Sequence, residues 1–214
     1  MISHPTLRII HEEHSTLSAV LRSIGLLLSE SRRHGVFPDC RVLRAMLFYI
    51  DEFPERVHHP KETALLFPKL RMRSDSLAEV LDRLDRDHAQ SHAAVRELEH
   101  EVLGLEMMGD GPDGAMRLEQ FEKSMNDYIA GYLDHIRAEE RDVLPVAKRV
   151  LTTGDWAELD AAFTCNRDPL TLREPDDEFR PLFKRILMTL PSPVGLGPAI
   201  EALRGAGGPI TRPS

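Results

Sequence analysis

The sequence predicts an all-α protein in which four long helices form an up-down-up-down bundle, followed by a short C-terminal helical extension. Apolar residues recur at steps of three and four, which is the helical period. Alternating apolar and polar patterns, which would indicate strands, are scarce. Three short segments rich in helix breakers separate the long stretches: RRHGVFPD at 32–39, RMRSDS at 71–76 and MGDGPDGA at 108–115.

Each long helix carries its own apolar stripe. The stripes cover residues 7–28, 39–72, 77–105 and 118–146. The second stripe is the least regular, because Pro54 and Pro60 interrupt it and an interior proline removes a helical hydrogen bond. Ser74 or Asp75 is the expected N-cap of the third helix. Because the connections are short, neighbouring helices should be antiparallel.

The chain divides into a bundle and a C-terminal part. We expect the bundle at residues 1–152, a helical extension packed on it at 153–190 and a tail at 191–214. Two weaker helices are predicted in the extension, near residues 154–164 and 175–189. The tail is rich in proline and glycine.

Composition excludes several classes of function. The net charge of −8 disfavours binding to nucleic acid, and no apolar run is long enough to span a membrane. Phosphate-binding loops, dinucleotide-binding motifs and hydrolase nucleophile elbows are absent. Only Cys40 and Cys165 are present, without CxxC spacing, and we find no secretory signal. We therefore expect a cytoplasmic monomer or homodimer with no nucleic-acid or membrane partner.

Polar side chains with metal-binding chemistry interrupt the apolar stripes. His14, His88, His135 and Glu139 lie at positions that should face the bundle core. Buried polar groups are normally paired or bound to metal, because burying an unpaired one is costly. A single such histidine is usually a hydrogen-bonded core residue, but ligand-type side chains on three stripes favour a metal site.

A repeated motif provides candidate ligands on the remaining helix, the second. It consists of a histidine, a glutamate four residues later and a proline beyond them; it occurs at His58, Glu62 and Pro68, and again at His135, Glu139 and Pro145. A histidine from the preceding helix accompanies each copy, His14 the first and His88 the second. The chain thus resembles one helical hairpin used twice. Two facing hairpins would bring imidazoles and carboxylates to one level of the core.

The donor types indicate which metals fit. His92, one turn beyond His88, is a further candidate, so the full set is His14, His58, Glu62, His88, His92, His135 and Glu139. Histidine and glutamate without thiolate are typical of non-haem iron or manganese, with zinc as an alternative. The set is too large for one tetrahedral zinc and suits two ions bridged by carboxylates. Coordination by His58 would offset the cost of Pro60, which leaves the Arg56 carbonyl without its helical donor.

Neighbouring polar residues carry simpler expectations. His11 lies one turn before His14 and is expected to orient it. His59 is rotated by about 100° from His58. We therefore expect it in solvent, with His4, His34 and His100. Surface charges are expected at Glu12, Glu13, Glu52 and Glu55. Core packing is expected of Tyr128 and Tyr132, with hydrogen bonding to a bound oxygen species as the alternative.

Four segments in order resemble the hemerythrin-like family, also called the HHE cation-binding domain. They are HEEH at 11–14, HHPKE to LFP at 58–68, DHAQSH at 87–92 and HIRAEERDVLP at 135–145, and the resemblance covers roughly residues 5–150. It implies a four-helix bundle around two non-haem iron ions, oxo- or hydroxo-bridged, that meet O2, NO or H2O2. The resemblance carries the ligand role to the candidate set above.

One position departs from the family pattern. Oxygen-carrying members use His-x-x-x-x-Asp in the last helix, whereas here the five-residue step reaches Glu140 and the four-residue step reaches Glu139. Glu139 lies on the apolar stripe and is favoured, with Glu140 as alternative ligand or outer partner. Three functions remain open: a protein that binds or senses O2 or handles iron, a di-iron enzyme acting on peroxide or nitric oxide in stress response or iron-sulfur repair, and a metal-free structural module.

Overall fold

The computed structural model describes residues 4–109 and 111–166, and within them every regular element is a helix. The elements are α1 Pro5–His34, α2 Cys40–Ile50, η1 Asp51–His58, α3 His59–Lys61, η2 Glu62–Leu66, α4 Phe67–Arg73, η3 Asp75–Leu77, α5 Ala78–Met108, α6 Gly114–Ala138, η4 Glu139–Val143, α7 Leu144–Val150 and α8 Thr153–Phe163. The prediction of an all-α bundle is therefore confirmed.

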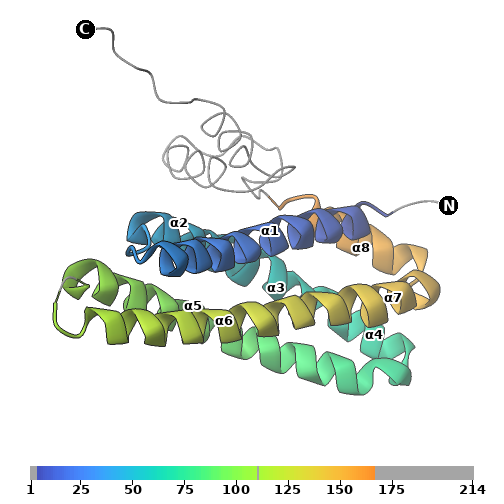
Figure 1. Ribbon diagram of the computed structural model, residues 1–214. Coiled ribbons are helices and arrows are strands. Elements are labelled where there is room, and N and C mark those ends of the chain that lie inside the picture. Colours follow the sequence, from blue (N-terminus) through green and yellow to red (C-terminus); the bar gives the residue numbers. More distant parts are fainter. Residues whose placement is uncertain (1–3, 110, 167–214) are drawn as a thin grey trace, which may run out of the picture.

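Four antiparallel rods build the bundle (Figure 1). The first is α1, the second runs continuously from α2 to α4, the third is α5, and the fourth runs from α6 to α7. The first rod contacts the second and the fourth, and the third rod contacts the same two. All four rods therefore surround one core.

The core consists of two apolar clusters with a polar layer between them. One cluster includes Leu17, Ile50 and Val95, and the other includes Ile10 and Leu84. On α1, His14 lies between Ile10 and Leu17, and the other rods repeat this order. The polar residues of the layer are buried, and His88 is the most exposed of them at 9%. Apolar packing on both sides thus holds the layer in place.

The prolines of the second and fourth rods coincide with π-helical turns. The amide of His59 donates to the Pro54 carbonyl, five residues back, and the amide of Phe67 donates in the same way to Glu62. The α-helical segments that follow carry Pro60 and Pro68 in their first two positions, where a missing N–H costs little. Proline and π turn therefore come together, and such turns occur often at functional sites.

The fourth rod repeats this device. The amide of Leu144 donates to the Glu139 carbonyl, five residues back, and Pro145 stands at the start of α7. Both glutamates of the repeated motif thus begin a π turn, which places residues five apart, Glu139 and Leu144 for example, on one face.

The helix expected near 154–164 is found as α8. A capping box between Thr152 and Asp155 starts it. α8 packs against α1 (Figure 1), and Asp160 accepts hydrogen bonds from the Thr6 amide and hydroxyl at 2.9 Å and 2.6 Å. His4 stacks on Trp156 with ring centroids 4.1 Å apart, so the expectation of a solvated His4 is wrong. The helix predicted near 175–189 and the tail at 191–214 lie outside the described residues.

None of the helices in the described ranges combines the length and apolar character needed to cross a lipid bilayer.

Candidate metal centre

Six predicted residues meet at one level of the bundle core. They come from all four rods and are all buried: His14, His58, Glu62, His88, His135 and Glu139. Two groups of possible ligand atoms result, each with its atoms within 4.8 Å of one another; they are His14, His58, Glu62 and Glu139, and His59, Glu62, His88 and His135.

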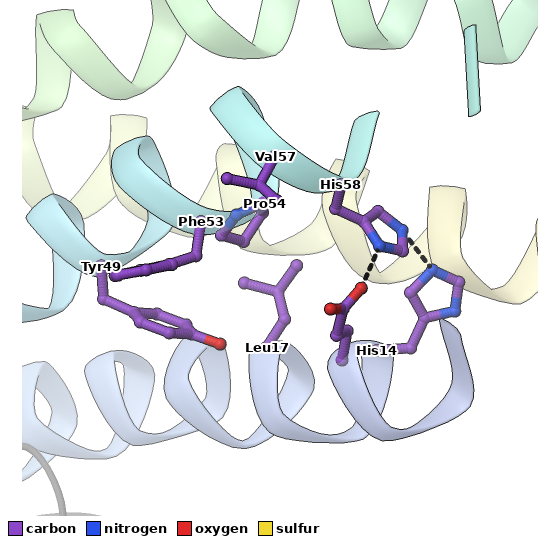
Figure 2. A pocket seen from close by; sticks show the side chains of 8 residues that line it. His14, Leu17, Tyr49, Phe53, Pro54, Val57 and His58 are labelled. Carbon is purple, nitrogen blue, oxygen red and sulfur yellow. Dashed lines mark hydrogen bonds and ion pairs between the residues drawn. The ribbon is translucent and has the colours of Figure 1, made fainter. Parts of the chain in front are cut away.

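The first group forms between α1 and the second rod. Figure 2 shows His14 and His58 facing each other, and their Nε2 atoms are 3.2 Å apart. The Nε2 atom of His14 lies 3.1 Å from Oε2 of Glu139, and that of His58 lies 3.1 Å from Oε1 of Glu62. Two imidazoles thus aim their inner nitrogens at the space that the two carboxylates also face.

The second group forms between α5 and α6 in the same way. The Nε2 atoms of His88 and His135 are 3.1 Å apart. The remaining oxygens of the two carboxylates face this pair: Oε2 of Glu62 lies 3.6 Å from His88, and Oε1 of Glu139 lies 3.4 Å from His135. Each carboxylate therefore directs one oxygen to each imidazole pair, which is the arrangement of a bridging ligand.

A partner outside the group holds each of the four imidazoles at its Nδ1 atom. These contacts join His14 to Glu140 (3.2 Å), His58 to Glu13 (2.7 Å), His88 to Thr63 (2.8 Å) and His135 to Asp87 (3.3 Å). A ring whose Nδ1–H donates outward presents the Nε2 lone pair inward. Metal-binding histidines are usually oriented by such a bond, which also makes them better ligands.

The two inner carboxylates fit a cation. Glu62 and Glu139 are fully buried, and none of their four oxygens accepts a well-directed hydrogen bond. Imidazole nitrogens lie 3.1 Å from these carboxylates, but a short distance alone does not make a hydrogen bond. Two like charges without donors are costly in a core, and cations between the imidazole pairs would neutralise them.

The pKa values of the ligand side chains shift strongly with their surroundings when no metal is bound. Burial lowers the pKa of His135, but Glu139 and Asp87 outweigh it and raise that pKa to about 10. Burial and the neighbouring Glu139 raise the pKa of Glu62. His88 moves in the other direction: burial, with His59 and His135 nearby, lowers its pKa to about 2. The raised pKa of His135 therefore favours a positive charge beside Glu139 and Asp87.

His59 and Glu55 correct the sequence-based expectation. Both were expected in solvent or at the surface, yet both are buried. Nδ1 of His59 is 3.2 Å from Glu55, and its Nε2 accepts a hydrogen bond of 2.8 Å from Tyr132. Its ring also stacks on His88 with centroids 4.0 Å apart. The second rod lies between two other rods, so a rotation of about 100° from His58 keeps His59 inside the bundle.

Several other residues lie differently from the simplest expectation. His92 is in neither group: its side chain is 45% exposed, and its Nε2 is 3.4 Å from Asp51. Glu140 is also in neither group. Its Oε1 atom lies 3.1 Å from Nδ1 of His11 and 3.2 Å from Nδ1 of His14. His11 thus meets His14 through a shared carboxylate.

The outer partners on neighbouring rods were missed. Glu13, expected at the surface, is largely covered and holds His58. No expectation was attached to Thr63 or Asp87. Only the step of four from Glu55 to His59 offered a sequence signal of this kind, because residues four apart share a helix face.

The fold and this layer define a helical bundle whose core carries histidine and glutamate groups suited to metal. The family model of the hemerythrin HHE cation-binding domain matches residues 6–147, and the chain therefore belongs to that family. A search of curated proteins finds no match.

Proposed function

We propose that this chain is a non-haem di-iron protein that binds or senses O2 or handles iron. The proposed ligands are His14, His58, Glu62, His88, His135 and Glu139. The observation that carries the proposal is the pair of buried carboxylates that lack directed hydrogen bonds, each facing both imidazole pairs.

Two ions suit the geometry better than one. Each imidazole pair has its own side of the layer, and each carboxylate offers one oxygen to each side. Imidazole with carboxylate and no thiolate favours iron or manganese over structural zinc. When bound, such ions supply redox and Lewis-acid chemistry toward O2, NO or H2O2.

Residues around the proposed ligands orient and cover them. Outer carboxylates such as Asp87 contact Nδ1 of their imidazoles and fix the direction of Nε2. The two apolar clusters cover the layer on both of its faces along the bundle. Cys40 and Cys165 are free thiols, which suits a cytoplasmic location.

Metal analysis after anaerobic reconstitution tests the proposal. The chain is stripped with a chelator, supplied with Fe(II), Mn(II) or Zn(II) and freed of excess ion, and its metal content is measured with its optical spectrum. We expect two iron ions per chain, one for each group. The His14→Ala variant should lose occupancy, whereas the matched His92→Ala variant should keep it. Less than one ion per chain in the parent would leave the metal-free structural module as the better reading.

A second function is favoured by the hydrogen-bonding groups beside the second imidazole pair. Tyr132, His59 and Glu55 form a buried chain there, and Ser91 links Glu55 to Tyr128. An enzyme that turns over peroxide or nitric oxide needs such polar groups to position its substrate. Stopped-flow mixing of the reduced protein with O2, H2O2 and NO separates the two functions. A stable, reversible adduct supports binding, and repeated loss of substrate supports the enzyme.

A further inference from the structure

The candidate centre is buried, so an ion needs a way in. On the side of His14 and His58 the cavity seen in Figure 2 has a volume of only about 10 Å³ and a mostly apolar lining that includes Leu17 and Val57. That volume holds about one water molecule. Among the described residues, Glu13 is the one carboxylate that lines it, and its oxygen is 2.7 Å from Nδ1 of His58. A hydrated cation would find no room there.

The opposite side is different. A cavity of about 190 Å³ lies between α5 and α6; we call it the α5–α6 cavity. Asp127 and Gly131, which line it, are exposed, whereas Tyr132 and His135, which also line it, are buried. It therefore leads from the surface to an imidazole of the second group, and its volume is many times that of the cavity beside His14 and His58.

The lining of the α5–α6 cavity favours cations. Asp87 and Asp127 contribute carboxylates from opposite helices, and none of the lining residues is lysine or arginine. Ser91 and Tyr128 add hydroxyl oxygens. Negative charge in a cleft with low-dielectric walls concentrates cations and repels anions. Oxygen atoms along the path can also replace water on an ion that is losing its hydration shell.

The inner end of the α5–α6 cavity reaches the candidate metal centre. Asp87, which lines the cavity, is 3.3 Å from Nδ1 of His135, and Nε2 of the same ring faces His88. We propose that divalent cations enter the core through the α5–α6 cavity, passing Asp127 and Asp87 to reach His135 and His88. This route rests on the proposed function, since it presupposes that the core takes up metal.

A plug at Gly131 tests the route. A Cβ added there meets no atom within 4 Å, so Gly131→Leu adds bulk to the cavity wall without a clash at its Cβ. Gly104 on α5 is equally open and does not line the cavity, so Gly104→Leu is the matched control. Leucine is a better helix former than glycine, and neither change should lower the melting temperature.

The readout is the rate at which the stripped full-length chain takes up Co²⁺, followed by its d–d absorption in a stopped-flow instrument. We expect Gly131→Leu to slow uptake by about tenfold or more, which corresponds to about 1.4 kcal/mol of added barrier. Gly104→Leu should match the parent, and all three proteins should reach the same final occupancy. Equal rates for the two variants would overturn the route, as would a loss of final occupancy confined to Gly131→Leu.

A charge change provides a second test. Asp127→Asn should slow uptake at low ionic strength and lose the difference at high salt, because attraction between exposed charges is screened. Glu119→Gln removes an equal charge from an exposed position on the same helix outside the cavity and should have no effect. Equal slowing by both variants would refute entry past Asp127. A parent that takes up no Co²⁺ would refute the proposed function and the route together, whereas normal uptake at an unchanged rate in Gly131→Leu refutes the route alone.

Discussion

Replacing Glu139 and Glu140 in turn by glutamine tests the ligand assignment at its most specific point. The two residues are adjacent and chemically identical, but Glu139 is buried 3.1 Å from Nε2 of His14, whereas Glu140 is 38% exposed and 3.2 Å from Nδ1 of the same ring. Glu139→Gln removes the charge of a carboxylate whose oxygens face both imidazole pairs. Glu140→Gln removes only an outer partner.

The expected magnitudes differ clearly. Metal at about a thousand times its dissociation constant stabilises the fold by about 4 kcal/mol, and each kcal/mol moves the melting temperature by about 2–4 °C in a chain of this size. The parent should therefore gain about 8–16 °C on metal binding. Glu139→Gln should lose nearly all of that gain. Loss of an outer partner costs about 10–100-fold in affinity, or about 1.4–2.7 kcal/mol, so Glu140→Gln should keep roughly half.

Calorimetric melting with and without metal measures the effect. The quantity compared is the rise in melting temperature that metal causes within each variant, which cancels differences in intrinsic stability. Metal content is determined on the same samples. A normal rise in Glu139→Gln with none in Glu140→Gln would refute the assignment and make Glu140 the ligand.

Three further predictions concern the surroundings of the centre. Thr63→Val removes the partner of His88 Nδ1 and should weaken metal affinity by about 10–100-fold while saturating metal still fills the site, as equilibrium dialysis would show. The raised pKa of His135, about 10 without metal, means that this ring is protonated near neutral pH and must release its proton to bind an ion. Affinity should therefore rise with pH between about 6 and 9, with proton release visible by titration calorimetry in buffers of different ionisation enthalpy; binding without release would contradict the site. Tyr132→Phe leaves buried His59 without its donor and should lower the unfolding free energy by about 1–3 kcal/mol in urea melts, with metal content unchanged.

The sequence predicted the fold because period and spacing are properties of single helices. Steps of three and four identified the rods, and the shared step from His58 to Glu62 and from His135 to Glu139 identified one face on two of them. The six residues that the structure brings together were all named from these local rules. Prolines also marked the disturbed turns, although the π-helical form of those turns was not predicted.

The features that the sequence did not predict depend on how the rods are rotated against one another. His92 shares a helix face with His88, but the third rod directs it to Asp51 and toward solvent. His59 was assigned to solvent because one inward face was assumed, whereas a rod between two others has a wider buried arc. Partners across rods, such as Glu13 for His58, leave no pattern within either helix.

Each half of the chain places a carboxylate beside a histidine of the other half. Glu62 belongs to the N-terminal half but faces His88, and Glu139 belongs to the C-terminal half but faces His14. Neither half on its own owns a complete set of donors. Ions held in this way would cross-link the two halves. Loss of the ions would weaken the contact between the halves before it destabilised either half.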